Sequence, residues 1–307
     1  MFRKLNLKII LPIFLVLLII LVIVKYIDTK KGERTFKDNL VTVDPDQVTE
    51  VQIFPRPMKG KSFNITKNGD SWILESDGKK YNADPSIVNS MISELNRLKP
   101  LSVVATKKER WGQYEVTDSL GTRVKLFDKE QLLADVVVGK FNINQPQDMT
   151  SYVRLVNDNN VYDVNGYASM TFTQPLNAYR DQKVIKDDTK NWTKLTFTYP
   201  SDSSFVLSRI DNQWMINGAS ADSAAVVKYL STIGRLSNDK FAEADSAGSP
   251  NHTLKIEGDN LAAPIQVNGY LKKGSYMVES SQNPGTYFNS TSLADKIFIS
   301  RNKLLKQ

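Results

Sequence analysis

Few side chains in this 307-residue chain could carry out acid–base or metal chemistry, and His252 is the only histidine among them. One imidazole excludes metal sites built from several histidines and catalytic schemes that need two. The surrounding segment, Ser249-Pro250-Asn251-His252-Thr253, is typical of a turn, so we expect His252 to be an exposed loop residue. The absence of cysteine excludes disulfides, thiolate metal sites and cysteine nucleophiles.

Two pairs of aspartates, Asp44 with Asp46 and Asp187 with Asp188, are the carboxylates whose spacing suggests catalysis. Carboxylates that face each other across a cleft can support general acid–base catalysis or glycoside hydrolysis. Both pairs, however, lie in loops that lead into predicted strands, where aspartate commonly stabilises a turn. We therefore expect a structural role for both pairs, and a carboxylate-based hydrolase is the least favoured alternative.

The segments Asn157–Asn160 and Asp77-Gly78 superficially resemble calcium-binding loops. Neither has the alternating oxygen ligands and distal glutamate of an EF-hand, so we expect turns. A Gly-x-Ser-x-Gly elbow, a P-loop and a dinucleotide-binding glycine motif are absent from the sequence. The sequence thus predicts no catalytic, cofactor-binding or metal-binding residues and no cofactor.

The predicted helices and strands that would position these side chains occur as two similar copies in the sequence. Asp84 can cap a helix that begins at Pro85, and apolar residues follow at helical spacing. The same pattern returns 138 residues later, after Asp222. Six positions match without a gap: Ala83/Ala221, Asp84/Asp222, Val88/Val226, Ser93/Ser231, Arg97/Arg235 and Leu98/Leu236.

Predicted strands surround each helix. Val48–Ile53 and Trp192–Phe197 alternate with a period of two, which favours half-buried strands. Further strands follow the helices at Thr122–Phe127, Asp135–Val138, Ser151–Val156 and Val161–Val164 in the first copy, and at Thr253–Glu257, Pro264–Val267, Ser275–Glu279 and Thr286–Phe288 in the second. This order predicts an α+β fold with two tandem units, each an antiparallel sheet with one packed helix.

Four tryptophans, Trp72, Trp111, Trp192 and Trp214, could build a platform that stacks on sugars. Trp72 and Trp214 occupy the same place in the two copies, at the exit of a tight turn before each helix. We therefore expect them to pack in the core or at a sheet edge. Exposed aromatic side chains in a groove shared by the copies would instead favour glycan binding.

The uncharged apolar run Ile9–Val24 predicts an uncleaved membrane anchor, because its length with its flanks suits a bilayer and no small-residue cleavage site follows it. The short positive region before it places the N-terminus in the cytoplasm and the two repeats in the periplasm, as a single-pass protein of the inner membrane. The expected organisation is a cytoplasmic tail over 1–8, a transmembrane anchor over 9–27, a basic linker over 28–35, and α+β repeats over 36–178 and 179–307.

The net charge of +7 is concentrated near the N-terminus. Residues 1–34 hold seven Lys/Arg against two acidic residues, which leaves 33 basic and 31 acidic residues in the rest of the chain. A nearly neutral body lacks the basic stripe that tracks phosphates in nucleic-acid-binding proteins. We therefore expect no nucleic acid partner, and we expect the basic flanks to contact anionic membrane lipid.

Short motifs in the first copy carry a family resemblance. They are the block from Trp72 through Ala83-Asp84 to Leu95 and Leu98, the strand end Val136–Lys140, the hairpin Tyr152-Val153-Arg154 with Val161-Tyr162, and Tyr179-Arg180-Asp181. With these motifs, residues 36–200 resemble the bacterial domain-of-unknown-function 4340 family, and the second copy resembles it more loosely. The resemblance implies a membrane-anchored envelope protein, in some cases beside a gliding-motility-type ABC transporter, and it implies no catalytic residues.

These observations together predict a non-enzymatic, membrane-anchored envelope protein that acts as an interaction or accessory module. An ABC-type transporter is the expected membrane protein partner. The main alternative is a module that binds envelope glycans or peptides.

Overall fold

The computed structural model describes residues 16–22, 38–56, 62–145, 148–243, 248–272 and 274–306. Residues 16–22 are helical, and no helix in the described part of the chain is long and apolar enough to cross a membrane. This finding corrects the predicted transmembrane helix over 9–27 and the single-pass inner-membrane location that depended on it. The predicted tail and linker, and the remainder of the predicted anchor, lie outside the described residues.

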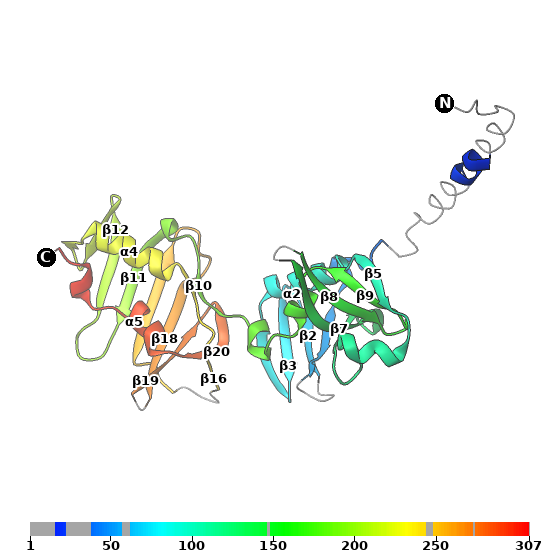
Figure 1. Cartoon of the computed structure of the whole chain (residues 1–307). Coiled ribbons are helices and arrows are strands. Elements are labelled where there is room, and N and C mark those ends of the chain that lie inside the picture. The colour runs from blue at the N-terminus through cyan, green and yellow to red at the C-terminus, as the bar shows by residue number, and fades with distance from the viewer. Residues whose placement is uncertain are drawn as a thin grey trace, which may run out of the picture.

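Two nine-stranded antiparallel sheets with the same strand order make up most of the described chain (Figure 1). The first sheet has the order β4-β3-β2-β1-β6-β7-β8-β9-β5. Its strands are β1 (Glu50–Phe54), β2 (Phe63–Asn68), β3 (Ser71–Ser76), β4 (Lys79–Ala83), β5 (Pro100–Ala105), β6 (Thr122–Asp128), β7 (Gln131–Gln145), β8 (Asp148–Leu155) and β9 (Val161–Asn165). The part of the chain built on this sheet is called the first copy below.

The second copy is built on a sheet with the order β14-β13-β12-β11-β17-β18-β19-β20-β16. Its strands are β11 (Trp192–Thr198), β12 (Phe205–Ile210), β13 (Gln213–Ile216), β14 (Ala219–Ser220), β16 (Phe241–Ala242), β17 (His252–Gly258), β18 (Ile265–Lys272), β19 (Ser275–Ser280) and β20 (Asn283–Asn289). A separate two-stranded sheet pairs β10 (Lys183–Lys186) with β15 (Arg235–Ser237).

The described residues of each copy form two α-helices, which corrects the prediction of one helix per unit. They are α2 (Pro85–Asn96) and α3 (Ala168–Phe172) in the first copy, and α4 (Ser223–Ile233) and α5 (Thr291–Ile297) in the second. Short 3-10 helices are η1 (Pro45–Gln47), η3 (Lys108–Tyr114), η4 (Leu176–Tyr179), η5 (Thr189–Asn191) and η6 (Arg301–Leu304). The additional helices α3 and α5 have only five and seven residues, too few to produce a clear 3.6-residue period in the sequence.

The two copies also agree in hydrogen-bond detail. Ala83 forms an isolated bridge with Arg180, and Ala221 forms the matching bridge with Leu305. Beside these bridges, the amide of Asp84 donates to the carbonyl of Tyr179 at 3.1 Å, and the amide of Asp222 donates to the carbonyl of Leu304 at 2.8 Å. In both copies the chain therefore returns after its second helix to the strand that leads into the first.

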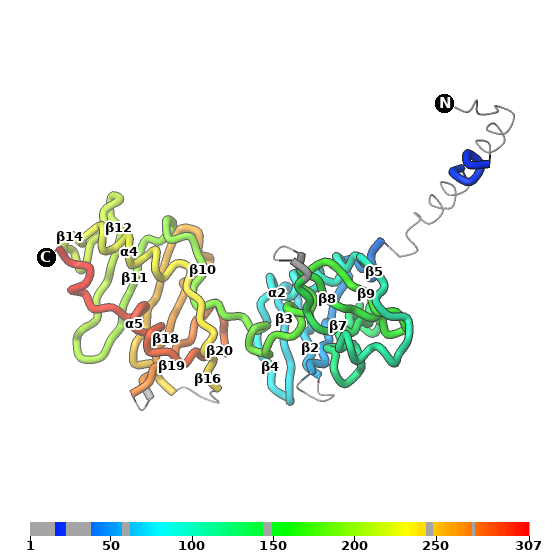
Figure 2. Tube along the Cα trace, viewed as in Figure 1, coloured from blue at the N-terminus to red at the C-terminus, as the bar shows by residue number. Residues whose placement is uncertain are grey.

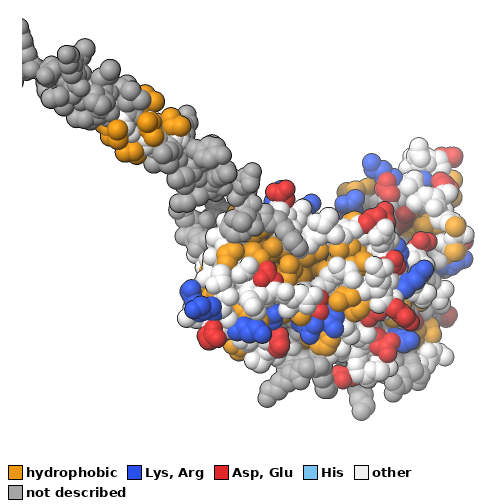
Figure 3. All heavy atoms as spheres, turned by 90° about the vertical axis from the view of Figure 1, so that its right-hand side faces the viewer, with side chains coloured by type: hydrophobic (Ala, Val, Ile, Leu, Met, Phe, Trp, Pro, Cys, Tyr) orange, Lys and Arg blue, Asp and Glu red, His pale blue; other side chains and the backbone are white. Residues whose placement is uncertain are grey.

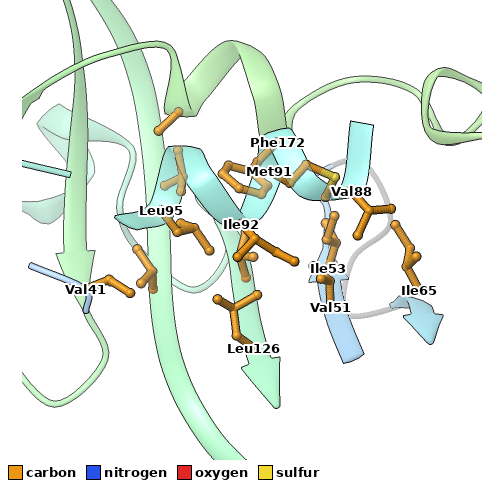
Figure 4. Packing of buried hydrophobic residues seen from close by; sticks show 14 of the residues in the cluster. Val41, Val51, Ile53, Ile65, Val88, Met91, Ile92, Leu95, Leu126 and Phe172 are labelled. Carbon is orange, nitrogen blue, oxygen red and sulfur yellow. The ribbon is translucent and has the colours of Figure 1, made fainter. Parts of the chain in front are cut away.

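Helix α2 shows why the repeated sequence pattern produces this packing. The Asp84 carboxylate accepts a hydrogen bond from the Ser86 amide at 2.8 Å, and Pro85 occupies the first helical turn. The buried face of the helix, which includes Met91 and Leu95, lies on the sheet beside Phe172 of α3 (Figure 4). Burial of each such side chain contributes about 1.5–3 kcal/mol to folding, so this face fixes the helix on the sheet.

A band of apolar side chains crosses the end of the first copy that faces away from the second (Figure 3). On this face Lys and Arg side chains alternate with Asp and Glu rather than forming a continuous stripe (Figure 3). Among the exposed apolar residues of this copy, Leu101 of the edge strand β5 is 52% exposed.

The cores can be tested by truncating Leu95, which is 0% exposed in α2. We expect Leu95→Ala to lower the free energy of unfolding by about 2–5 kcal/mol, because it removes buried methyl groups and leaves a cavity. Val227→Ala, at a helix position that is 63% exposed, is the control and should change stability by less than about 0.5 kcal/mol. Urea unfolding measures both, and equal small losses would contradict the packing of α2.

Candidate functional site

Three of the four paired aspartates, Asp44, Asp187 and Asp188, have the structural roles predicted from the sequence, and Asp46 is exposed. Asp44 caps η1 by accepting the amide of Asp46 at 3.1 Å, and Asp188 caps η5 by accepting the amide of Lys190 at 3.1 Å. Asp187 accepts hydrogen bonds from the indole of Trp192 and, at 3.0 Å, from the Asn260 amide. These carboxylates are therefore engaged in holding turns and the entry to β11.

The two segments that resemble calcium loops are turns. Asp77 and Gly78 have positive φ values of 50° and 75°, as a tight two-residue hairpin between β3 and β4 requires. The Asp158 carboxylate accepts the Asn160 amide at 2.9 Å and the hydroxyl of Tyr162. Across the described residues, no three His, Cys, Asp or Glu side chains are placed to hold a metal ion.

The tryptophans do not form one platform. Trp72 and Trp192 are 5% and 0% exposed, and Trp214 packs against the second core. Trp111 stacks on the guanidinium of Arg154, at 3.9 Å from its ring centre. The prediction of a packing role for Trp72 and Trp214 is confirmed, and the tryptophan arrangement expected of a glycan-binding groove is not formed.

His252 is not an exposed loop residue, which corrects the sequence prediction. It is the first residue of β17, and its ring is packed among the rings of Tyr199, Tyr276 and Phe298 at 4.9, 5.5 and 5.5 Å between centres. Its Nδ1 atom is buried, with no hydrogen-bond partner in the described chain. Burial lowers the pKa of His252, because protonation would place a charge and an unpaired N–H among aromatic rings.

The junction between the copies is built around Arg180, a residue that sequence reasoning did not single out as functional. Its guanidinium lies between two aromatic rings, 4.0 Å from the centre of Tyr81 in β4 and 3.8 Å from that of Phe241 in β16. The Arg180 residue is 4% exposed and lies 3.7 Å from a carboxylate oxygen of Glu243. Because one ring comes from each copy, this cation–π sandwich joins the two sheets.

A side-chain amide network completes the junction. Asn82 of β4 donates to the Asn283 side chain at 2.9 Å and to the Pro284 carbonyl at 3.0 Å. Asn283, which is 1% exposed, donates in turn to the carbonyls of Asp181 and Lys183 at 2.7 and 3.1 Å. Hydrogen bonds from Asn283 of the second copy thus fix the connecting segment. The chain passes from the first copy to the second through this one segment (Figure 2).

The matching edge of the second copy lacks this chemistry. In the first copy, β3 pairs with Tyr81 and Asn82 of β4. At the equivalent positions of the second copy, β13 pairs with Ala219 and Ser220 of β14. Leu305 stands where the first copy has Arg180. Tyr81, Asn82 and Arg180 of the first copy therefore have no counterparts of the same chemistry at the β14 edge of the second copy.

A groove of about 1050 Å³ opens beside the junction. It is lined by the start of α2 in the first copy, by the connecting segment and β10, and by β15. Four carboxylates line it, and all four have intramolecular partners: Asp84 and Asp188 as caps, Asp187 as above, and Asp181 by accepting the Lys183 amide at 2.8 Å. Burial raises the pKa of Asp181, in keeping with its place at the base of the groove.

Three cations remain at the groove surface. Lys186, Lys190 and Arg235 are exposed, and within the described part of the chain none of them lies within 4.0 Å of a carboxylate oxygen. Among the described side chains that line the groove, the charged groups with neither an ion-pair partner nor a hydrogen-bond partner are therefore these three cations. This arrangement can attract an anionic group, but it does not present a free pair of carboxylates for catalysis.

Fold and junction together define a duplicated α+β protein whose two antiparallel sheets are joined by the buried Arg180 and by the Asn82–Asn283 amide network. The chain belongs to the family described as a domain of unknown function (DUF4340), whose model matches residues 74–255. This range begins in β3 of the first copy and ends in β17 of the second, so it includes the junction and the groove. No curated protein and no solved structure gives a significant match to the chain.

The junction can be tested with Arg180→Gln. We expect a loss of about 2–4 kcal/mol in the free energy of unfolding, the size of two desolvated cation–π contacts, and a broader range of particle dimensions in small-angle scattering. Arg110→Gln is the control, because the exposed Arg110 lies 5.8 Å from the Tyr114 ring within one copy. Unchanged scattering and stability in Arg180→Gln would contradict the role of the sandwich.

The environment of His252 predicts a pH dependence. Its folded pKa is below the 6.5 of an unperturbed histidine, so the neutral ring favours the folded state above pH 6.5 and this contribution is lost as the pH falls through the folded pKa. Proton NMR of the imidazole Cε1–H follows the titration without assignment ambiguity, since the chain has one histidine. A midpoint at or above 6.5 would show that the ring is not enclosed.

Proposed function

We propose that the chain is a non-enzymatic interaction module that binds an acidic segment of a partner protein in the groove between its two copies. The observation that carries this proposal is the set of three cations, Lys186, Lys190 and Arg235, at the surface of a groove whose carboxylates have internal partners. Electrostatic complementarity of this kind speeds encounter and selects partners by charge.

The junction supports the same proposal. Binding to a groove lined by two units is tight only if the units are held in one orientation beforehand, because ordering them on binding costs free energy. The Arg180 sandwich and the Asn82–Asn283 hydrogen bond supply this preorganisation. The groove can therefore be recognised as a single surface although the copies have separate cores.

The alternatives have less support. A carboxylate-based hydrolase requires two carboxyl groups free to face a substrate, whereas Asp84 and Asp188 accept helix-capping hydrogen bonds and Asp181 is buried. A glycan-binding groove requires aromatic surfaces at its walls, whereas the groove is lined mainly by charged and small polar residues.

Binding of fluorescein-labelled octaglutamate, followed by fluorescence anisotropy, tests the groove. We expect the wild-type chain to bind and the triple variant Lys186→Glu, Lys190→Glu, Arg235→Glu to lose at least tenfold in affinity, because repulsion replaces attraction. Binding of the wild type should also weaken as salt rises from 50 to 300 mM.

The charge-matched control reverses three exposed lysines outside the groove, Lys67→Glu, Lys107→Glu and Lys228→Glu. Equal loss in the control and the triple groove variant would show that only overall charge matters and would overturn the groove proposal. Crosslinking of the wild type and the triple groove variant in cells then identifies the partner. An ABC-type transporter subunit, the partner expected from the family resemblance, is the first candidate to examine.

A further inference from the structure

Each copy has a pocket at the same place in its fold, apart from the groove. Ile53 pairs with Val124 in the first copy, and Phe197 pairs with Leu254 in the second. Thr122 and His252 each lie two residues before the second member of these pairs, so they occupy equivalent positions. Thr122 lines a pocket of about 430 Å³, and His252 lines one of about 410 Å³. The wall opposite is formed in both cases by the turn that follows α3 or α5.

The second copy packs aromatic rings at this position. Besides His252, they are Tyr199, Tyr276 and Phe298. The Phe298 ring lies on Gly269, where an added Cβ would be only 2.5 Å from the ring. The three aromatic rings pack against the second core and surround His252.

The first copy has small and polar residues at the same positions. By strand register, Pro55 replaces Tyr199 and Ser151 replaces Tyr276. Thr173, the C-cap residue that follows α3, replaces Phe298, the C-cap residue that follows α5. Rings that fill space in one copy are therefore replaced in the other by shorter side chains, several of which carry hydroxyl groups.

Charge and hydrogen bonding give the first pocket its chemistry. Arg56 and Lys140 line it, and none of the described residues that line it is acidic. Thr122 is 0% exposed, and its hydroxyl has no hydrogen-bond partner in the described chain; the Nε of Arg56 is also buried and unpartnered, although its guanidinium pairs with Glu115. A buried hydroxyl without a partner is costly, and an oxygen-bearing ligand would remove that cost.

The remaining wall is apolar, with Pro55, Phe141, Met170 and Pro175. A volume of about 430 Å³ lies in the range of small-ligand pockets. Two cations, a buried hydroxyl and an apolar wall together match a carboxylate on a short apolar stem. A fully hydrated inorganic anion would leave the apolar wall without a contact.

We infer that this pocket of the first copy binds a carboxylate carried on a short apolar stem, either a free organic acid or the C-terminal residue of a peptide. Lys140 balances the charge of the carboxylate, because the charge of Arg56 is already balanced by Glu115. The Nε–H of Arg56 and the Thr122 hydroxyl, both buried without a partner in the described chain, donate hydrogen bonds to it. The second copy does not bind this group, although its pocket is similar in volume, because Asp202 lines that pocket and would repel a carboxylate.

Ligand-observed NMR with the full chain tests the inference, with hexanoate as the probe and hexanamide as its uncharged counterpart. We expect hexanoate to bind and hexanamide to bind at least tenfold more weakly. Trileucine and its C-terminal amide form a second pair, and tighter binding of trileucine than of hexanoate identifies a peptide C-terminus as the source. Absence of hexanoate and trileucine binding at millimolar concentration, or equal binding of the charged and uncharged forms, overturns the inference.

Two variants locate the site. Lys140→Gln, at an exposed position, should weaken hexanoate binding about tenfold, the effect of one charge-assisted hydrogen bond. Thr122→Val should weaken binding while the midpoint of thermal unfolding stays the same or rises, because the buried unpartnered hydroxyl is removed. Arg301→Gln, in the pocket of the second copy, is the matched control and should leave binding unchanged. Full binding by both first-copy variants, or an equal loss in Arg301→Gln, overturns the inference.

Discussion

The packing of one guanidinium between two aromatic rings is the constraint on which the arrangement of the whole molecule depends. Each copy has its own core, and the β10–β15 pairing belongs to the second copy and its entry segment. Arg180 places a ring of each copy within 4.0 Å of one charged group. A planar cation that can stack on both faces is needed here, and lysine would not replace it. The relative placement of the sheets, and hence the shape of the groove, depends on this contact together with the Asn82–Asn283 hydrogen bond.

Much of the fold could be predicted because its determinants are local in sequence. Asp84 and Asp222 cap helices beside apolar residues at helical spacing, and both helices α2 and α4 are found where the pattern indicates them. The central strands β1 and β11 are predicted from alternation, within two residues of their observed bounds. Short elements with few periodic residues, such as α3 and α5, gave no such signal.

The candidate sites could not be predicted in the same way, because their residues meet only in the folded chain. Tyr81, Arg180 and Phe241 are widely separated in sequence, and a cation–π contact has no periodic pattern. The first-copy pocket depends on Thr122 being buried without a partner, which no sequence feature indicates. The sequence predicts an exposed loop position for His252, because the proline and asparagine before it favour a turn. In the structure the turn ends before the histidine, and β17 begins at His252 itself. The predicted membrane-spanning helix depended on the apolar run Ile9–Val24, its flanks and the lack of a cleavage site, and the described chain contains no helix long and apolar enough to cross a membrane.

The absence of the junction residues from the β14 edge has a consequence for assembly. The two copies contact each other through different faces. If both of these faces were also exposed at the two ends of the molecule, the same contact would join one molecule to the next and build an open filament. Here the end of the second copy offers Ala219, Ser220 and Leu305 where a further unit would need a tyrosine, an asparagine and an arginine. The contact that joins the copies within one chain therefore cannot be repeated between chains, and duplication yields a closed pair instead of a growing polymer.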